Sequence, residues 1–173
     1  MWSVFRWVFG GGGGGGEARG GGLGDDDPGQ VLAGLPVATA AAVPRAREDW
    51  LVQKVERRAG VYRDLEGQEL ILDNGLIRRT IRIEPNGATV GLDNLMTGAS
   101  LLRSVKPEAL VTLDGREFKV GGLVGQPNHA YLRAEWVGEL QAEPTAFRLT
   151  GLQLKPTEAL FGWQRRRLAV SAA

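Results

Sequence analysis

From about residue 50 onward, apolar and polar residues alternate along the chain with a period of two. Over residues 77–83 the isoleucines occupy one phase of this alternation, and Arg79 is the one charged residue among them. Because successive side chains of a strand point to opposite faces, the pattern predicts a half-buried strand. Asn86-Gly87 follows, a dipeptide that readily takes the positive φ angles of a tight hairpin turn. The alternation resumes over 88–92, which we interpret as the return strand.

Two more dipeptides of this kind predict turns. Asn74-Gly75 precedes the isoleucine-rich strand, and Asp114-Gly115 separates two further alternating segments. Strands joined by such short turns run antiparallel, since a parallel pair needs a crossover of about a dozen residues or more. The expected fold is therefore mostly β, an antiparallel β-sandwich with one short helix and a disordered, glycine-rich N-terminal tail.

The one short helix is expected at about residues 130–140. Leu132, Trp136 and Leu140 recur there with helical spacing, and Gly138 weakens the helix.

Strand patterns return after this helix. The apolar phase shifts across Gly151, and such a shift at a glycine predicts a β-bulge. Residues 159–170 are expected to add one more strand.

The N-terminal part of the chain differs in composition from the rest. Half of the 26 glycines of the whole chain fall within residues 10–34. Such a segment buries too little apolar surface to offset the entropy lost on ordering, so residues 1–49 are expected to be a disordered tail. Residues 50–173 are expected to form the β-sandwich domain, either complete or incomplete. Residues 31–43 have the apolar and small residues of a signal segment, but Asp25 to Asp27 stand where positive charge belongs. Two interpretations of residues 31–43 therefore remain. They are a degenerate signal segment, which would make the protein secreted or periplasmic, or a linker.

Composition narrows the classes of function. The 173 residues suit one domain and a tail, and 21 Lys and Arg against 20 Asp and Glu leave a net charge of +1, too small to attract nucleic acid through a global field. The absence of cysteine excludes disulfides, thiolate catalysis and cysteine-ligated metal. No apolar run is long enough for a membrane-spanning helix. We expect neither nucleic acid nor a membrane span among the interactions, and no cofactor.

Candidate catalytic residues are few. His129 is the only histidine, so a serine triad and the common zinc sites are not expected, and a loop imidazole bonded to backbone is the simplest interpretation. Two carboxylates that converge in space would leave glycoside hydrolysis open. The candidates for such a pair are Asp73, Asp93, Asp114, Glu117 and Glu135. Several of them sit in or beside turns, where Asp commonly bonds its own backbone.

Aromatic residues offer a different chemistry, because the C–H groups of a sugar ring pack well on an aromatic face. Trp163, Trp136 and Tyr131 are candidate carbohydrate-binding residues, and His129 and Asn128 are polar candidates close to them in sequence. The alternative for the aromatic residues is packing in the core.

Three phrases carry a resemblance to a known family: LDNGLIRR at 72–79, PNGATV at 85–90 and DNLMTG at 93–98. Together they resemble the start of an alpha-galactosidase-like glycoside hydrolase, over about residues 50–170. In that family an N-terminal β-sandwich packs on a (β/α)₈ barrel whose two aspartates are catalytic. No barrel follows here, so no catalytic residue is carried over.

The resemblance implies a non-catalytic accessory β-sandwich domain, a fragment or short relative whose partner is carbohydrate or the missing barrel. An exposed apolar surface is then expected where the barrel would pack. The alternatives are a free-standing carbohydrate-binding module and a small two-carboxylate glycosidase.

Overall fold

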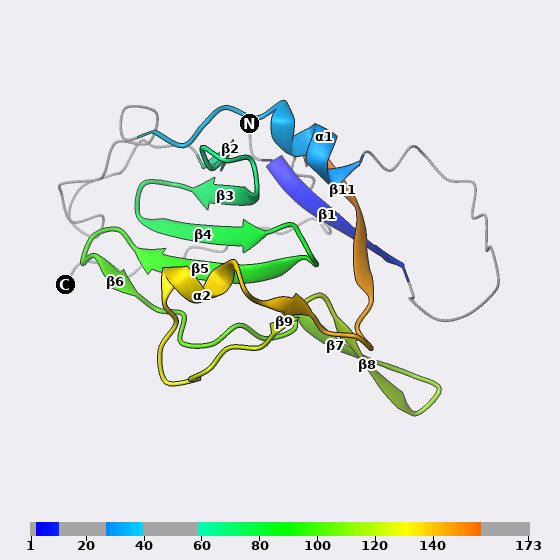
Figure 1. Cartoon of the computed structure of the whole chain (residues 1–173). Coiled ribbons are helices and arrows are strands. Elements are labelled where there is room, and N and C mark those ends of the chain that lie inside the picture. Colours follow the sequence, from blue (N-terminus) through cyan, green and yellow to red (C-terminus); the bar gives the residue numbers. More distant parts are fainter. Residues whose placement is uncertain (1–2, 11–26, 40–58, 157–173) are drawn as a thin grey trace, which may run out of the picture.

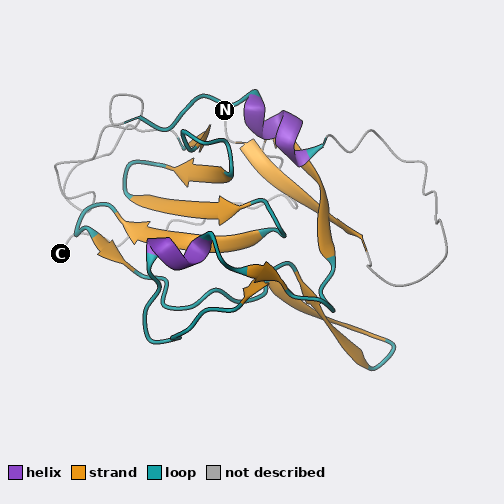
Figure 2. Ribbon diagram, viewed as in Figure 1, coloured by secondary structure: helices purple, strands orange, loops and turns teal. Residues whose placement is uncertain are grey.

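The computed structural model describes residues 3–10, 27–39 and 59–156. Within these ranges the fold is mostly β, antiparallel and sandwich-like, as predicted, and it has two short helices (Figures 1 and 2). Its largest sheet has five strands in sequential order: β2 (Gly60–Arg63), β3 (Glu69–Asp73), β4 (Ile77–Arg82), β5 (Ala88–Asn94) and β6 (Ala99–Ser100).

Three two-stranded sheets and two helices complete the described part of the chain. The sheets are β1 (Ser3–Gly10) with β11 (Arg148–Pro156), β7 (Ala109–Leu113) with β8 (Arg116–Val120), and β9 (Leu123–Val124) with β10 (Gln141–Ala142). The helices are α1 (Pro28–Ala33) and α2 (Ala134–Val137). Among the described residues, neither helix is long and apolar enough to cross a membrane.

Two of the predicted turns form by the expected chemistry. Gly75 has a φ of 80°, and the Asp73 carboxylate accepts its backbone N–H at 2.6 Å. At the tip of the β7–β8 hairpin, Asp114 and Gly115 both have positive φ, of 49° and 75°. This is the backbone that Asp-Gly turns favour.

The third predicted turn, at Asn86-Gly87, joins the expected strands, but the positive φ angles expected there are wrong. Neither Asn86 nor Gly87 has a positive φ. The Asn86 side chain is instead buried, only 2% of the residue being exposed, and it accepts the backbone N–H of Leu149 at 2.9 Å while donating to the Phe147 carbonyl at 3.2 Å. Asn86 is therefore the link between the β4–β5 turn and β11.

Different elements cover the two faces of the five-stranded sheet. On one face a buried cluster joins the sheet to α1 and β11 through Leu32, Leu70, Ile81, Ile83 and Leu152. On the other face a second cluster joins β5 to the segments around α2 and β9 through Ala88, Val105, Leu123 and Leu140. Burying each such leucine or isoleucine side chain stabilises the fold by about 1.5–3 kcal/mol.

Arg79, the charged residue on the apolar phase of β4, has specific partners. Its guanidinium donates to the Thr89 hydroxyl at 2.7 and 2.9 Å and pairs with the Glu108 carboxylate. These bonds satisfy a charge that the alternation alone leaves unexplained.

Two elements lie inside the segment 1–49, so the expected disorder does not extend to all of it. β1 pairs along its length with β11, and Leu32 of α1 is 1% exposed in the first core cluster. The register shifts beside Gly151, because Val8 pairs with Gly151 and Phe9 with Leu149. The bulge predicted at this glycine is therefore confirmed.

The predicted helix at 130–140 is shorter than expected. Only α2 is helical, since Arg133 supplies no capping bond before it and Gly138 follows it directly. Leu132 and Leu140 still pack into the second cluster. The strand expected at 159–170 lies outside the described residues.

Candidate functional site

The loop between β9 and α2 carries most of the predicted site residues, and one buried side chain holds it in place. Gln126 is 8% exposed. Its Oε1 accepts the backbone N–H of Val105 at 3.0 Å, and its Nε2 donates to the carbonyls of Arg103 at 3.1 Å and Tyr131 at 3.0 Å. The amide thereby joins two segments that are distant in sequence and leaves the loop with a defined shape.

His129 projects from this loop and has a side-chain partner. Its Nδ1 lies 2.7 Å from the Ser104 hydroxyl. The expectation of a backbone partner for His129 is therefore wrong, because the loop lies against the segment that carries Ser104. Asn128 shapes the loop itself, since its Oδ1 accepts the backbone N–H of Ala130 at 2.8 Å.

The structure brings Tyr131 and Trp136 together. Their ring centroids are 5.4 Å apart and the ring planes are inclined by 31°. Tyr131 is 41% exposed and Trp136 is half-buried, so the pair is not a core contact alone. The Arg133 guanidinium carbon lies 5.6 Å from the Tyr131 ring and 5.7 Å from the Trp136 ring, within range of a cation–π interaction with both.

These three side chains form what we call the aromatic platform: Tyr131, Arg133 and Trp136. It stands at the start of α2, on the side of the sheet covered by the second core cluster (Figure 1). The aromatic members were predicted from the sequence, but Arg133 was not, and its only signal is its place between two aromatic residues. Trp163, the third aromatic candidate, lies outside the described residues.

A cavity of about 200 Å³ is lined in part by residues of the same loop. Its wall includes Lys106, Lys119, Gln126, His129 and Glu143. Neither lysine was selected from the sequence, because nothing in a single strand or loop pattern shows that they meet.

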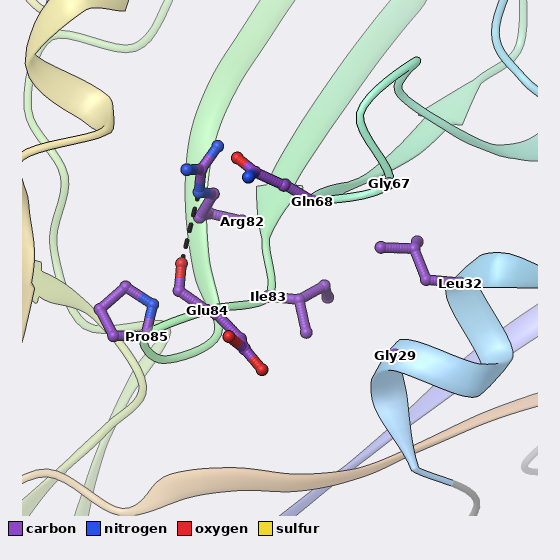
Figure 3. Close-up of a pocket in the computed structure, with 8 residues that line it drawn as sticks. All are labelled: Gly29, Leu32, Gly67, Gln68, Arg82, Ile83, Glu84 and Pro85. Carbon is purple, nitrogen blue, oxygen red and sulfur yellow. Dashed lines mark hydrogen bonds between the residues drawn. The ribbon is translucent and has the colours of Figure 1, made fainter.

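The largest hollow described lies between α1 and the sheet, with a volume of about 450 Å³. Leu32 and Ile83 form its apolar side, while Gln68 and Arg82 approach one another at its polar side (Figure 3). The Arg82 guanidinium is already engaged, because it pairs with Glu69 at 3.3 Å and donates to the Glu84 carbonyl at 3.3 Å. The guanidinium is therefore not free for a ligand.

The carboxylates proposed for glycoside hydrolysis have different surroundings. Asp73 and Asp93 flank Arg78 on adjacent strands, but the Asp73 side chain is 0% exposed and is bonded to Arg78 at 2.8 Å. Asp114 and Glu117 are exposed on the β7–β8 hairpin. Glu135 is likewise exposed, on α2.

One acidic group that was not selected from the sequence has a perturbed pKa. Burial raises the pKa of the Glu69 carboxyl above its ordinary value of 4.5, and the Arg82 guanidinium opposes this in part. Glu69 lines a third hollow, of about 280 Å³, together with Asp93. It has a structural partner in Arg82, so its pKa alone does not make it catalytic.

No family model, curated protein or solved structure matches the chain. The resemblance to alpha-galactosidase-like glycoside hydrolases accordingly stays an expectation from sequence phrases.

Proposed function

We propose that the chain is a carbohydrate-binding accessory β-domain, and that the aromatic platform is its binding surface. The observation that carries this proposal is the exposed Tyr131 ring, which lies against the tilted Trp136 ring and within cation–π range of Arg133. A sugar ring presents C–H groups on one face and hydroxyl groups around its edge. The platform offers an aromatic face for the former and guanidinium N–H donors for the latter.

The supporting loop favours this use of the platform. Gln126 Nε2 donates to the Tyr131 backbone carbonyl, and the Arg133 guanidinium lies over both rings. A surface ordered before binding loses less conformational entropy when a ligand arrives. The platform therefore resembles a preformed stacking site more than a flexible surface loop.

The accessory role extends the same proposal. Exposed leucines occur on the β7–β8 hairpin, where Leu110 is 60% and Leu113 50% exposed, and this hairpin projects from the body of the molecule (Figure 1). Such residues suit contact with a partner domain. The resemblance to alpha-galactosidase-like enzymes supports a catalytic barrel as that partner and galactosyl oligosaccharides as the ligands to test first.

Calorimetric titration with galactosyl oligosaccharides tests the proposal. We expect saturable binding by the unaltered chain and a loss of affinity of about tenfold or more in Tyr131→Ala, because an aromatic contact at the centre of a small site is removed. Leu65→Ala is the matched control, since Leu65 is 82% exposed and remote from the platform in sequence. Equal affinity of both variants would refute the platform.

A further inference from the structure

The cavity that Gln126 and His129 line has an unbalanced set of charges. Lys119 Nζ is 3.0 Å from the Glu143 carboxylate, so these two groups neutralise each other. Lys106 lines the same cavity, is exposed, and has no ion-pair partner among the described residues. One ammonium group is therefore left to attract an anion.

His129 adds a hydrogen-bond donor to the same wall. The Ser104 hydroxyl lies 2.7 Å from Nδ1 and 3.4 Å from the Val105 carbonyl. In the tautomer in which Nδ1 accepts from this hydroxyl, Nε2 carries the ring proton and is the nitrogen left for a ligand. An ammonium and an imidazole N–H at one cavity suit the oxygens of an anionic group.

The size of the cavity indicates how much of a ligand enters it. Pockets that enclose a whole small molecule have volumes of roughly 300–1,000 Å³. At about 200 Å³ this cavity suits one substituent rather than an entire oligosaccharide. The platform and the cavity share the loop that Gln126 holds, and only Ala130 separates His129 from Tyr131 along the chain.

From these observations we propose that the cavity is a carboxylate subsite for an acidic saccharide: a uronic acid carboxylate contacts Lys106 and His129 while a sugar ring stacks on the platform. This inference rests on the proposed function, because it assigns a ligand class to the same loop. The two parts of the surface then have different roles: the platform binds the sugar ring, and the cavity favours a ligand with a negative charge.

The test compares trigalacturonate with its fully methyl-esterified form by calorimetry. The two trimers have the same rings, but only the first has carboxylates. We expect the free acid to bind about tenfold more tightly, a preference typical of one charge-assisted hydrogen bond, and we expect Lys106→Met to abolish it. Lys155→Met, which removes an exposed lysine on β11, should keep the preference.

The outcomes distinguish the two proposals. If both trimers bind equally and Tyr131→Ala weakens them, the platform stands and the carboxylate subsite is refuted. If the acid preference is present and depends on Lys106 but not on Tyr131, the subsite stands and the platform is refuted. Binding of neither trimer would overturn the acidic-saccharide inference, while galactosyl ligands would still decide the platform separately.

Discussion

Gln126 is a polar residue that determines the shape of an exposed site from a buried position. Its amide satisfies backbone groups on two segments, and nothing in its local sequence signals this. Tyr131 and Trp136 were recognisable as candidates because aromatic residues have intrinsic binding chemistry. Arg133 and Ser104 were not, because their roles arise from contacts that only the folded chain creates.

Replacing Gln126 should affect stability and binding together. We expect Gln126→Ala to lower the free energy of unfolding by about 2 kcal/mol, because buried backbone groups lose their partner. It should also weaken saccharide binding, since the Tyr131 backbone is released. Urea unfolding measures the first effect and calorimetry the second. Gln68→Ala, an exposed glutamine, is the control and should change stability by less than about 0.5 kcal/mol.

Glu69 should make stability depend on pH in a specific direction. Its pKa is raised by burial, so between 4.5 and the raised value the folded state binds more protons than the unfolded state. This contribution is fully present below pH 4.5 and is lost as the pH rises through the folded-state pKa. In Glu69→Gln the side chain at this position cannot ionise, so this contribution to the pH dependence of stability is absent.

The stability of the unaltered chain relative to Glu69→Gln should therefore be greatest near pH 4 and decline toward pH 7. Urea unfolding at several pH values measures this difference. Glu117→Gln, on the exposed hairpin, should follow the unaltered chain. A difference that stays constant or grows with pH would contradict the buried position of Glu69.

At the scale of elements, local chemistry predicts hairpins well and distant pairings poorly. Asp114-Gly115 specifies its turn because the two residues alone supply the required backbone angles. The bulge beside Gly151 was visible as a phase shift, but its partner strand β1 was not. That pairing joins the two ends of the described chain, and neither strand contains a signal for the other.

Asn86 connects elements in a way that can be measured. Asn86→Ala should lower the free energy of unfolding by about 2–3 kcal/mol, because the Leu149 and Gly87 N–H groups lose their acceptor, while the Phe147 carbonyl keeps only the Gly121 N–H. Amide hydrogen exchange should increase most at the start of β11. Asn94→Ala is the comparison: its side chain accepts only from the nearby Met96 and Thr97 N–H groups, so its effect should stay within the β5–β6 turn. Unchanged exchange at β11 in Asn86→Ala would refute the link.

At the scale of the whole molecule, the fold class follows from the alternation and the turns, whereas the ligand does not. The two core clusters place the sheet between layers and leave the loop at 126–133 on the surface. One net positive charge gives no overall preference for a partner. Recognition must therefore come from the local arrangement of the platform and the cavity.

Indole N–H signals in a nuclear magnetic resonance titration test the platform most directly. The chain has five tryptophans, and a Trp136→Phe variant identifies the signal of Trp136. We expect a galactosyl oligosaccharide to shift this signal in the unaltered chain and to leave it unmoved in Tyr131→Ala. If no indole signal shifts, or only that of Trp163, the platform is not the binding surface.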